Sequence, residues 1–196
     1  MPSQYAAGIL AFARHKGTAL VLLGKDVRVD AGYSDMGGKV ERVDKADVIV
    51  TACREFYEET CGVLYDATSL RRYITPHTAI VLKSHTQNNY PYFTFLIEVP
   101  FVPSLRSQYQ KIVNYLRFRS LMDPKSAIFQ KLVEKHDIQY VPARKLFDNS
   151  FHRRTIFAET VNMHRDVIED VIAGLEGGDN WRDICARYPW DTQQLA

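Results

Sequence analysis

The sequence has few cysteines, and their number and spacing exclude two common kinds of small protein. Its 196 residues contain three, Cys53, Cys61 and Cys185, and no two of them are close neighbours. An odd number of separated cysteines argues against a disulfide framework and against a zinc site of cysteines and histidines. It favours free thiols in a reducing compartment, so we expect a cytoplasmic protein.

Long apolar runs and a strong charge of one sign are also missing. No uninterrupted apolar stretch approaches the roughly 18 residues of a membrane-spanning helix, so we expect no membrane contact. The first apolar run lacks a basic start and is interrupted by Arg14 and His15, which argues against a signal peptide. The formal net charge of +2 excludes a polybasic protein of the histone type.

Hydrophobic residues make up 46% of the chain, which is enough for the core of one domain. In the first hundred residues, short apolar runs with Gly17 between two of them predict a hairpin followed by two further strands. These runs cover residues 8–14, 18–25, 73–85 and 90–101. Residues 44–60 instead have apolar side chains at every fourth position, which predicts a helix.

The second half of the chain changes to a helical pattern. Helices are predicted at residues 104–119 and 125–136, and a long helix at 155–175, with a short strand near 137–148 before it. We therefore expect one α+β domain, residues 1–196, in which helices cover both faces of a mixed sheet as an α/β/α sandwich. It would carry a helical insertion at about 103–136, a C-terminal helix and a short extension at about 179–196.

The helix predicted at residues 44–60 concentrates carboxylates on one face. Helical spacing aligns five positions on that face, Thr51, Glu55, Glu58, Glu59 and Gly62. Like charges so close together repel each other unless a positive group lies among them. A divalent cation such as Mg²⁺, which prefers oxygen ligands, would provide that charge. The alternative is a glutamate-rich stripe on a solvated surface helix.

The stretch GGKVERVDKADVIVTACREFYEETCGV, residues 37–63, resembles the Nudix box, G-x5-E-x7-R-E-U-x-E-E-x-G-U with U a bulky apolar residue. The leading glycine corresponds to Gly38, and the central R-E-U-x-E-E corresponds to Arg54, Glu55, Phe56, Glu58 and Glu59. The order of hairpin, glycine loop, helix and strands is also similar to the Nudix hydrolase superfamily. The resemblance extends over about residues 6–100 and implies a Nudix-type sheet between helices.

The sequence departs from the family pattern at both ends of the box. Asp44 stands where the family has glutamate, and nine residues instead of seven separate it from Arg54. Two residues instead of one precede Gly62, which we expect to end the helix. Asp44 is a candidate for the helix N-cap, with Asp47 supporting the first turn. Asp44 and Asp47 are both candidates for the acid that pairs with Arg54.

The resemblance implies an enzyme that hydrolyses a diphosphate linkage in a nucleoside diphosphate joined to another group X, with Mg²⁺ as cofactor and Mn²⁺ as a substitute. It implies that Glu55 and Glu59 bind the metal, that Glu58 is a further ligand or the general base, and that the Gly38 carbonyl completes the metal shell. Arg54 would orient the glutamates through a salt bridge.

Residues outside the helix are further candidates, each with an ordinary alternative. Glu98 is either a second candidate base or a charge at a strand end, and His77 either contacts phosphate or is a polar surface residue. Arg71 and Arg72 either hold a phosphate or start a strand. Lys39 follows the glycine pair and is a candidate for binding substrate.

The insertion adds alternatives for the substrate. It is rich in basic residues, namely Arg106, Lys111, Arg117, Arg119, Lys125 and Lys131. These form either a solvated helix face or a positive wall for a phosphorylated ligand, such as capped mRNA or a diphosphoinositol polyphosphate. A catalytically silent Nudix module that binds a nucleotide or RNA is the alternative of another class. The insertion also makes a homodimer plausible.

Overall fold

The centre of the molecule is a mixed β-sheet organised around its first strand. The structure is a computed structural model that describes residues 4–27, 32–123 and 133–195. Within these residues the sheet has seven strands, β1 (Ala6–His15), β2 (Thr18–Asp26), β3 (Tyr33–Ser34), β4 (Met36–Lys39), β5 (Ala79–His85), β6 (Pro91–Glu98) and β7 (Lys135–Pro142). Strand β1 pairs antiparallel with β2 and β4 and parallel with β6. Strand β5 extends the sheet beyond β6, and β3 and β7 both pair with β2.

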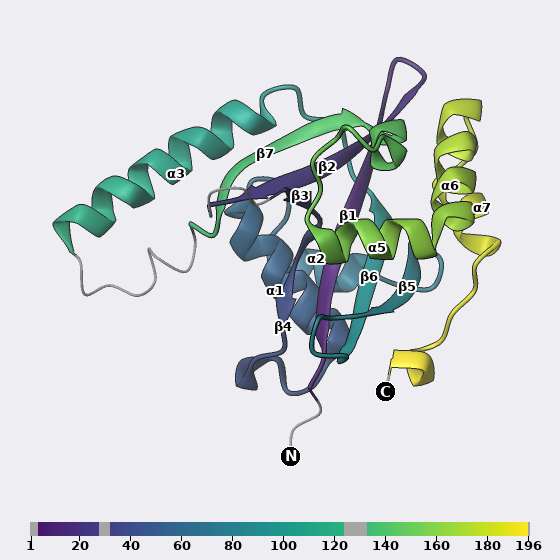
Figure 1. Cartoon of the computed structure of the whole chain (residues 1–196), viewed down its shortest axis with the longest axis horizontal. Helices are drawn as coiled ribbons and strands as arrows, with labels where there is room; N and C mark the ends of the chain where they lie inside the picture. Colours follow the sequence, from purple (N-terminus) through teal and green to yellow (C-terminus); the bar gives the residue numbers. More distant parts are fainter. Residues whose placement is uncertain (1–3, 28–31, 124–132, 196) are drawn as a thin grey trace.

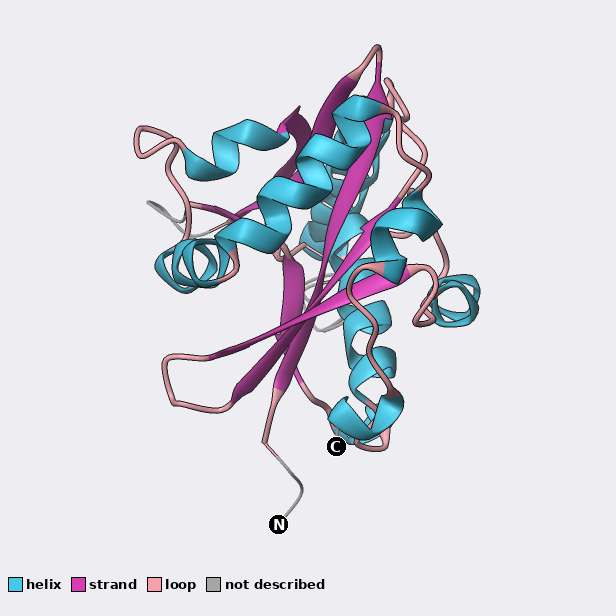
Figure 2. Ribbon diagram, turned by 90° about the vertical axis from the view of Figure 1, so that its right-hand side faces the viewer, coloured by secondary structure: helices cyan, strands magenta, loops and turns pink. Residues whose placement is uncertain are grey.

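Helices cover both faces of the sheet, as Figure 2 shows. They are α1 (Val48–Thr60), α2 (Ala67–Tyr73), α3 (Leu105–Met122), α5 (Thr155–Met163), α6 (Arg165–Gly177) and α7 (Trp181–Ala186). Successive side chains of β1 point to opposite faces. Ile9 and Ala11 pack in the cluster that contains residues of α1, α2 and α3, whereas Leu10 and Phe12 pack in the cluster with residues of α5, α6 and α7. The predicted α/β/α sandwich is confirmed.

Helix α1 begins later than the sequence suggested. Its N-cap is Asp47, whose carboxylate accepts hydrogen bonds from the Ile49 and Val50 amides at 2.9 and 3.1 Å. Asp44 instead ends a 3₁₀ turn, so the expectation that Asp44 caps the helix is wrong. The two residues after it, Lys45 and Ala46, have positive φ angles of 53° and 59°. They form the link that accommodates the two additional residues between Asp44 and Arg54.

The end of α1 also differs slightly from the prediction. The helix ends at Thr60, and Cys61 is the first residue in the left-handed conformation, followed by Gly62 with a φ of 66°. The amide of Gly62 donates to the Tyr57 carbonyl. The extra residue before the glycine therefore lengthens the C-terminal turn and leaves the preceding helix intact.

The predicted hairpin, the strands at β5 and β6 and the helix at α3 are all present, but three other predictions need correction. Residues 67–73 form helix α2, so Arg71 and Arg72 lie on a helix and do not start a strand. The long helix is two helices, α5 and α6, which meet at His164 at a sharp angle (Figure 1). The break lets α5 pack against β5 while α6 packs against β2, and the His164 ring lies 3.0 Å from the Lys83 carbonyl.

The expected helix at residues 125–136 falls mostly outside the described residues, as do Lys125 and Lys131. Its last two residues, Lys135 and His136, belong to β7 instead. Helix α3 extends away from the sheet (Figure 1), and its first half is anchored by the buried side chains of Leu105, Tyr109 and Val113. No helix in the described part of the chain has the length and apolar character that crossing a membrane requires.

Candidate active site

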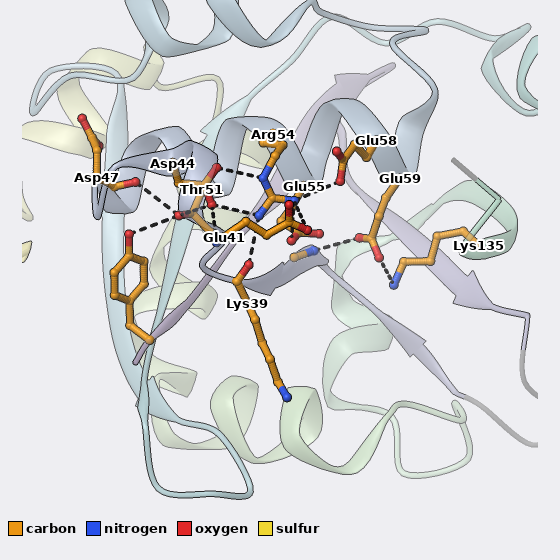
Figure 3. Close-up of polar contacts among 12 residues, drawn as sticks. Lys39, Glu41, Asp44, Asp47, Thr51, Arg54, Glu55, Glu58, Glu59 and Lys135 are labelled. Carbon is orange, nitrogen blue, oxygen red and sulfur yellow. Dashed lines mark hydrogen bonds and ion pairs between the residues drawn. The ribbon is translucent and has the colours of Figure 1, made fainter. Parts of the chain in front are cut away.

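Arg54 of α1 is the centre of the polar cluster that the box residues form (Figure 3). Its guanidinium binds Asp44 through two hydrogen bonds, from Nε at 2.8 Å and from Nη2 at 2.9 Å. Asp44 is only 1% exposed and also accepts hydrogen bonds from the Thr51 hydroxyl and the Glu41 amide. Asp44, and not Asp47, is therefore the acid that pairs with Arg54.

Three further bonds connect Arg54 to the rest of the box. Nη1 lies 2.8 Å from Glu55 and 2.9 Å from Glu58, and Nη2 donates to the Lys39 carbonyl at 2.9 Å. One side chain thus joins two glutamates of α1 to the loop after the glycine pair. This arrangement suits the orienting role expected for Arg54, and it offsets part of the repulsion between the glutamates.

Glu55 lies directly against the backbone of Gly38. A Cβ atom at position 38 would come within 2.6 Å of the Glu55 carboxylate carbon and of both its oxygens, so only glycine allows this approach. Glu55 is buried, and that burial raises its pKa to about 7 although Arg54 acts in the opposite direction. A buried carboxylate with this pKa is one that a cation would stabilise in its charged form.

Glu59 is more deeply enclosed and has a different set of partners. One of its oxygens accepts a hydrogen bond from the Gly37 amide at 2.8 Å, and the other lies 3.0 Å from the ammonium of Lys135. Burial raises the pKa of Glu59 to about 8, and the nearby Lys135 opposes that shift. Lys135 itself is 2% exposed. The charge of Glu59 is therefore balanced by Lys135, a side chain of the protein itself.

A pocket of about 550 Å³ opens beside the glycine pair. Its wall is formed by residues of β1, β4 and β6, by the turn before β6 and by the start of α5, including Gly38, Lys39, Asn88, Tyr90, Tyr92 and Arg154. This volume is typical of a site for a small molecule. Lys39 lines the pocket, and its side chain points away from the carboxylates (Figure 3).

The remaining candidates from the sequence lie elsewhere. Glu98 pairs with Arg14 at 3.2 Å at the far end of β6. On β1, Gly38 is opposite Ala7 and Glu98 is opposite Phe12, which separates the two by roughly 16 Å along the strand. The structure does not bring Glu98 to the carboxylates.

The basic candidates near α2 are also separate from the three box glutamates. Arg71 pairs with Asp47 at 3.3 Å, whereas Arg72 and His77 line a second pocket together with Arg182. That pocket includes Tyr73, whose hydroxyl donates to the Glu98 carbonyl, so it lies toward the Glu98 end of β6. Their proposed roles in binding substrate stay predictions.

Comparisons with known proteins bear on the fold. No family model matches the sequence, and no curated protein matches it. Among solved structures, a C. elegans Ap4A hydrolase binary complex is 14% identical, with a TM-score of 0.50 over 88% of this chain and 98% of that chain. RenU, a Nudix hydrolase from M. smegmatis, is 15% identical, with a TM-score of 0.49 over 85% of this chain and 87% of that chain. The Nudix domain of Shewanella oneidensis NrtR in complex with ADP ribose is 12% identical, with a TM-score of 0.48 over 85% and 88%.

This chain has the Nudix fold. The glycine pair lies on β4 and the glutamates lie on α1. The stretch that resembles the Nudix box therefore forms one strand–loop–helix unit. Strand β4 and helix α1 lie against each other, and both contact β1. The Nudix fold thus explains why the box residues, separated by a loop, converge on one end of the sheet.

Sequence reasoning missed two functional candidates in this part of the Nudix fold. Asp35 is buried beside the pocket and accepts a 2.7 Å hydrogen bond from the Tyr92 hydroxyl, and burial raises its pKa. Its position in the sequence, two residues before Gly37, could have indicated that Asp35 lies near the site. Lys135 carried no such indication, because it is far from the box in sequence and the pattern around it suggested a helix.

The residues present fit a magnesium ion held by few protein ligands. Within the described residues, no three Asp, Glu, His or Cys side chains converge into a metal cage. However, Glu55 and Glu58 both approach Arg54 Nη1 within 3 Å, and Glu55 rests on Gly38. Mg²⁺ usually binds through one or two carboxylates and completes its shell with water and substrate phosphates. Two hard oxygen donors beside a glycine backbone satisfy that requirement.

Proposed function

We propose that this protein is a Mg²⁺-dependent Nudix pyrophosphohydrolase that cleaves a diphosphate linkage in a nucleoside diphosphate-X substrate. The observation that carries the proposal is the intact cluster around Arg54, in which Glu55 lies against Gly38, a residue that also lines a ligand-sized pocket. A surface stripe of glutamates would not place buried carboxylates against a glycine beside a pocket. The ordinary alternative for these residues is therefore less consistent with the structure.

Glu55 and Glu58 would hold the metal ion, with the Gly38 carbonyl as a backbone ligand. When bound, the ion would neutralise charge on the diphosphate and lower the pKa of a water molecule. Arg54 keeps both glutamates in place and stays bound to Asp44, so we assign it an orienting role. Lys39 and Arg154, both exposed in the pocket wall, would meet the negative charge of the phosphates.

The reaction adds water across the P–O–P linkage. A water oxygen attacks one phosphorus, the bond from that phosphorus to the bridging oxygen breaks, and the bridging oxygen leaves with the second phosphate. The proton lost by the water needs an acceptor. Of the two base candidates from the sequence, Glu58 lies in the cluster and Glu98 does not, so we propose that a Glu58 oxygen that is not bound to the ion accepts this proton.

The test is phosphate or nucleotide release in the presence of Mg²⁺ across a panel of substrates. The panel contains dNTPs, ADP-ribose, NADH, a dinucleoside polyphosphate, capped RNA and a diphosphoinositol phosphate. We expect turnover of one nucleotide class, and a loss on the order of a hundredfold or more in Glu55→Gln. Glu98→Gln, with the same charge change at the other end of β6, is the matched control and should retain activity.

Two outcomes would contradict the proposal. Turnover that survives in Glu55→Gln would place the chemistry elsewhere in the molecule. No turnover of any substrate, together with retained nucleotide binding, would favour the silent Nudix module. Turnover confined to capped RNA or to the diphosphoinositol phosphate would replace the substrate class but keep the metal site.

A further inference from the structure

A buried lysine lies beside Glu59 in the carboxylate site, although the site is expected to hold a metal ion. Lys135, the first residue of β7, is 2% exposed and reaches Glu59 at 3.0 Å and the Ser34 hydroxyl at 3.1 Å. Lysine is almost never fully buried unless it is paired. Its partner here is one of the three box glutamates, which makes the pair a feature of the site itself.

The fold makes room for this side chain. At Gly24 of β2, a Cβ atom would lie 2.9 Å from Lys135 Cδ and 3.0 Å from Lys135 Cε. The same Cβ would also lie 3.0 Å from the sulfur of Met36. A larger residue at position 24 would therefore obstruct the path of the lysine. The aliphatic part of Lys135 passes over Gly24, and only its ammonium reaches Glu59.

Helix α3 holds the backbone from which Lys135 extends. The buried hydroxyl of Tyr109 donates to the Lys135 carbonyl at 2.8 Å, and Gln110 donates to the His136 carbonyl at 3.1 Å. Arg106 pairs with Asp137, the next residue along β7. Two hydrogen bonds and one ion pair thus connect three consecutive residues at the start of β7 to helix α3. Helix α3, the first part of the expected insertion, therefore positions a residue of the candidate active site.

We infer that Lys135 is a built-in counter-ion that fixes Glu59 on the Gly37 amide and keeps Glu59 out of the metal-ligand set. Glu59 accepts the Gly37 amide with one oxygen and pairs with Lys135 through the other, so a metal ion on Glu59 would lie beside a buried ammonium whose like charge opposes it. Metal binding is left to Glu55 and Glu58. Lys135 is then a positioning residue, which acts through Glu59 on the glycine pair. This inference rests on the proposed metal-dependent function.

Mn²⁺ binding without substrate, followed by the EPR signal of free Mn²⁺, tests the ligand set directly. We expect Glu59→Gln to bind Mn²⁺ within about threefold of the wild type, whereas Glu55→Gln weakens binding on the order of tenfold or more. Lys135→Met should bind Mn²⁺ about tenfold more tightly or take up a second ion, because Glu59 is released. In the Glu59→Gln, Lys135→Met double variant that gain should disappear. Lys145→Met, at an exposed position after β7, is the matched control and should bind as the wild type does.

Thermal unfolding of the same variants tests the pair without any metal. Lys135→Met leaves a buried carboxylate unpaired and should lower the Tm by about 10 °C. The double variant should lose clearly less than the sum of the two single losses, because it removes both charges. Additive losses would show that the two side chains do not interact and would overturn the inference.

The remaining outcomes separate this inference from the proposed function. If Glu59→Gln weakens Mn²⁺ binding as strongly as Glu55→Gln, Glu59 is a ligand and the inference fails, while the proposed function stands. If the wild type binds no Mn²⁺ and hydrolyses no substrate, the proposed function fails and the exclusion of Glu59 from a metal shell fails with it. The thermal cycle would still establish or refute the Lys135–Glu59 pair.

Discussion

At the scale of single residues, the bond between Arg54 and Asp44 is the contact on which the site geometry depends. Asp44→Asn removes the charge from a buried pair with two hydrogen bonds and leaves the guanidinium without its main partner. We expect a loss of about 3 kcal/mol in the free energy of unfolding, measured by urea denaturation. Asp183→Asn, at an exposed position of α7, is the control and should change stability by less than about 0.5 kcal/mol.

The same bond predicts part of the acid sensitivity of the protein. Burial alone would raise the pKa of Asp44, but hydrogen bonds from Arg54, the Glu41 amide and Thr51 outweigh it and hold the pKa below its usual value. The stabilisation is therefore fully present above the unfolded pKa of about 3.9 and is lost as the pH falls through the lower folded value. Stability measured between pH 5 and pH 2 should fall less steeply in Asp44→Asn than in the wild type. Parallel curves would contradict this account.

The cysteines form a third prediction at this scale. Burial raises the pKa of the Cys53 and Cys185 thiols to about 12 and that of Cys61 to about 11. Because the thiolate is the reactive form, labelling by a thiol reagent at pH 8 should be at least about a hundredfold slower in the native protein than in denaturant. Rapid labelling of one site in the native state, located by mass spectrometry, would show an exposed and activated thiol.

At the scale of elements, the start of α1 depends on Asp47. Its carboxylate accepts from two amides of the first turn, Ile49 and Val50. Asp47→Ala should lower stability by about 1 kcal/mol, and Asp47→Asn, which retains a capping oxygen, should cost only a few tenths. Chemical denaturation of both variants measures this difference. Equal losses would indicate that Asp47 stabilises the protein through its ion pair with Arg71 and not through the cap.

At the scale of the whole molecule, metal binding should stabilise the folded state. Glu55 meets the Gly38 backbone only after β4 and α1 have packed, so an ion that binds both binds the native chain and not the unfolded one. At a Mg²⁺ concentration of about 100 Kd, we expect the Tm to rise by about 5–10 °C, measured by calorimetry at constant ionic strength. Glu55→Gln should abolish most of this rise. An equal rise in that variant would indicate a metal site outside the box.

Several features of the fold and the site were predictable because their causes are local. The helical period around Phe56 and the hairpin at Gly17 depend on neighbours a few residues apart. The approach of Gly38 to Glu55 was expected instead from the resemblance to the Nudix box. The break at His164 was not predictable, because the apolar pattern of α5 and α6 is continuous and only packing on β5 and β2 separates the two helices. The start of β7 at Lys135 was assigned to a helix for a similar reason, although the rest of the strand was predicted. Its pairing with β2 overrides a pattern that favours a helix.

The sequence by itself determined the box residues of the candidate site, since Glu55, Glu58 and Glu59 share one helical face, Arg54 directly precedes Glu55, and Gly38 lies before the helix. Only the tertiary structure decided which charges meet. Asp44 and Asp47 are equally placed in sequence, and a left-handed link of two residues turns one toward Arg54 and makes the other a cap. Lys135 reaches Glu59 from another strand through space left by Gly24. The physical reason is that the period of the apolar residues shows which face of a helix or strand a residue lies on. The pairing of buried charges depends instead on contacts between elements that are distant along the chain.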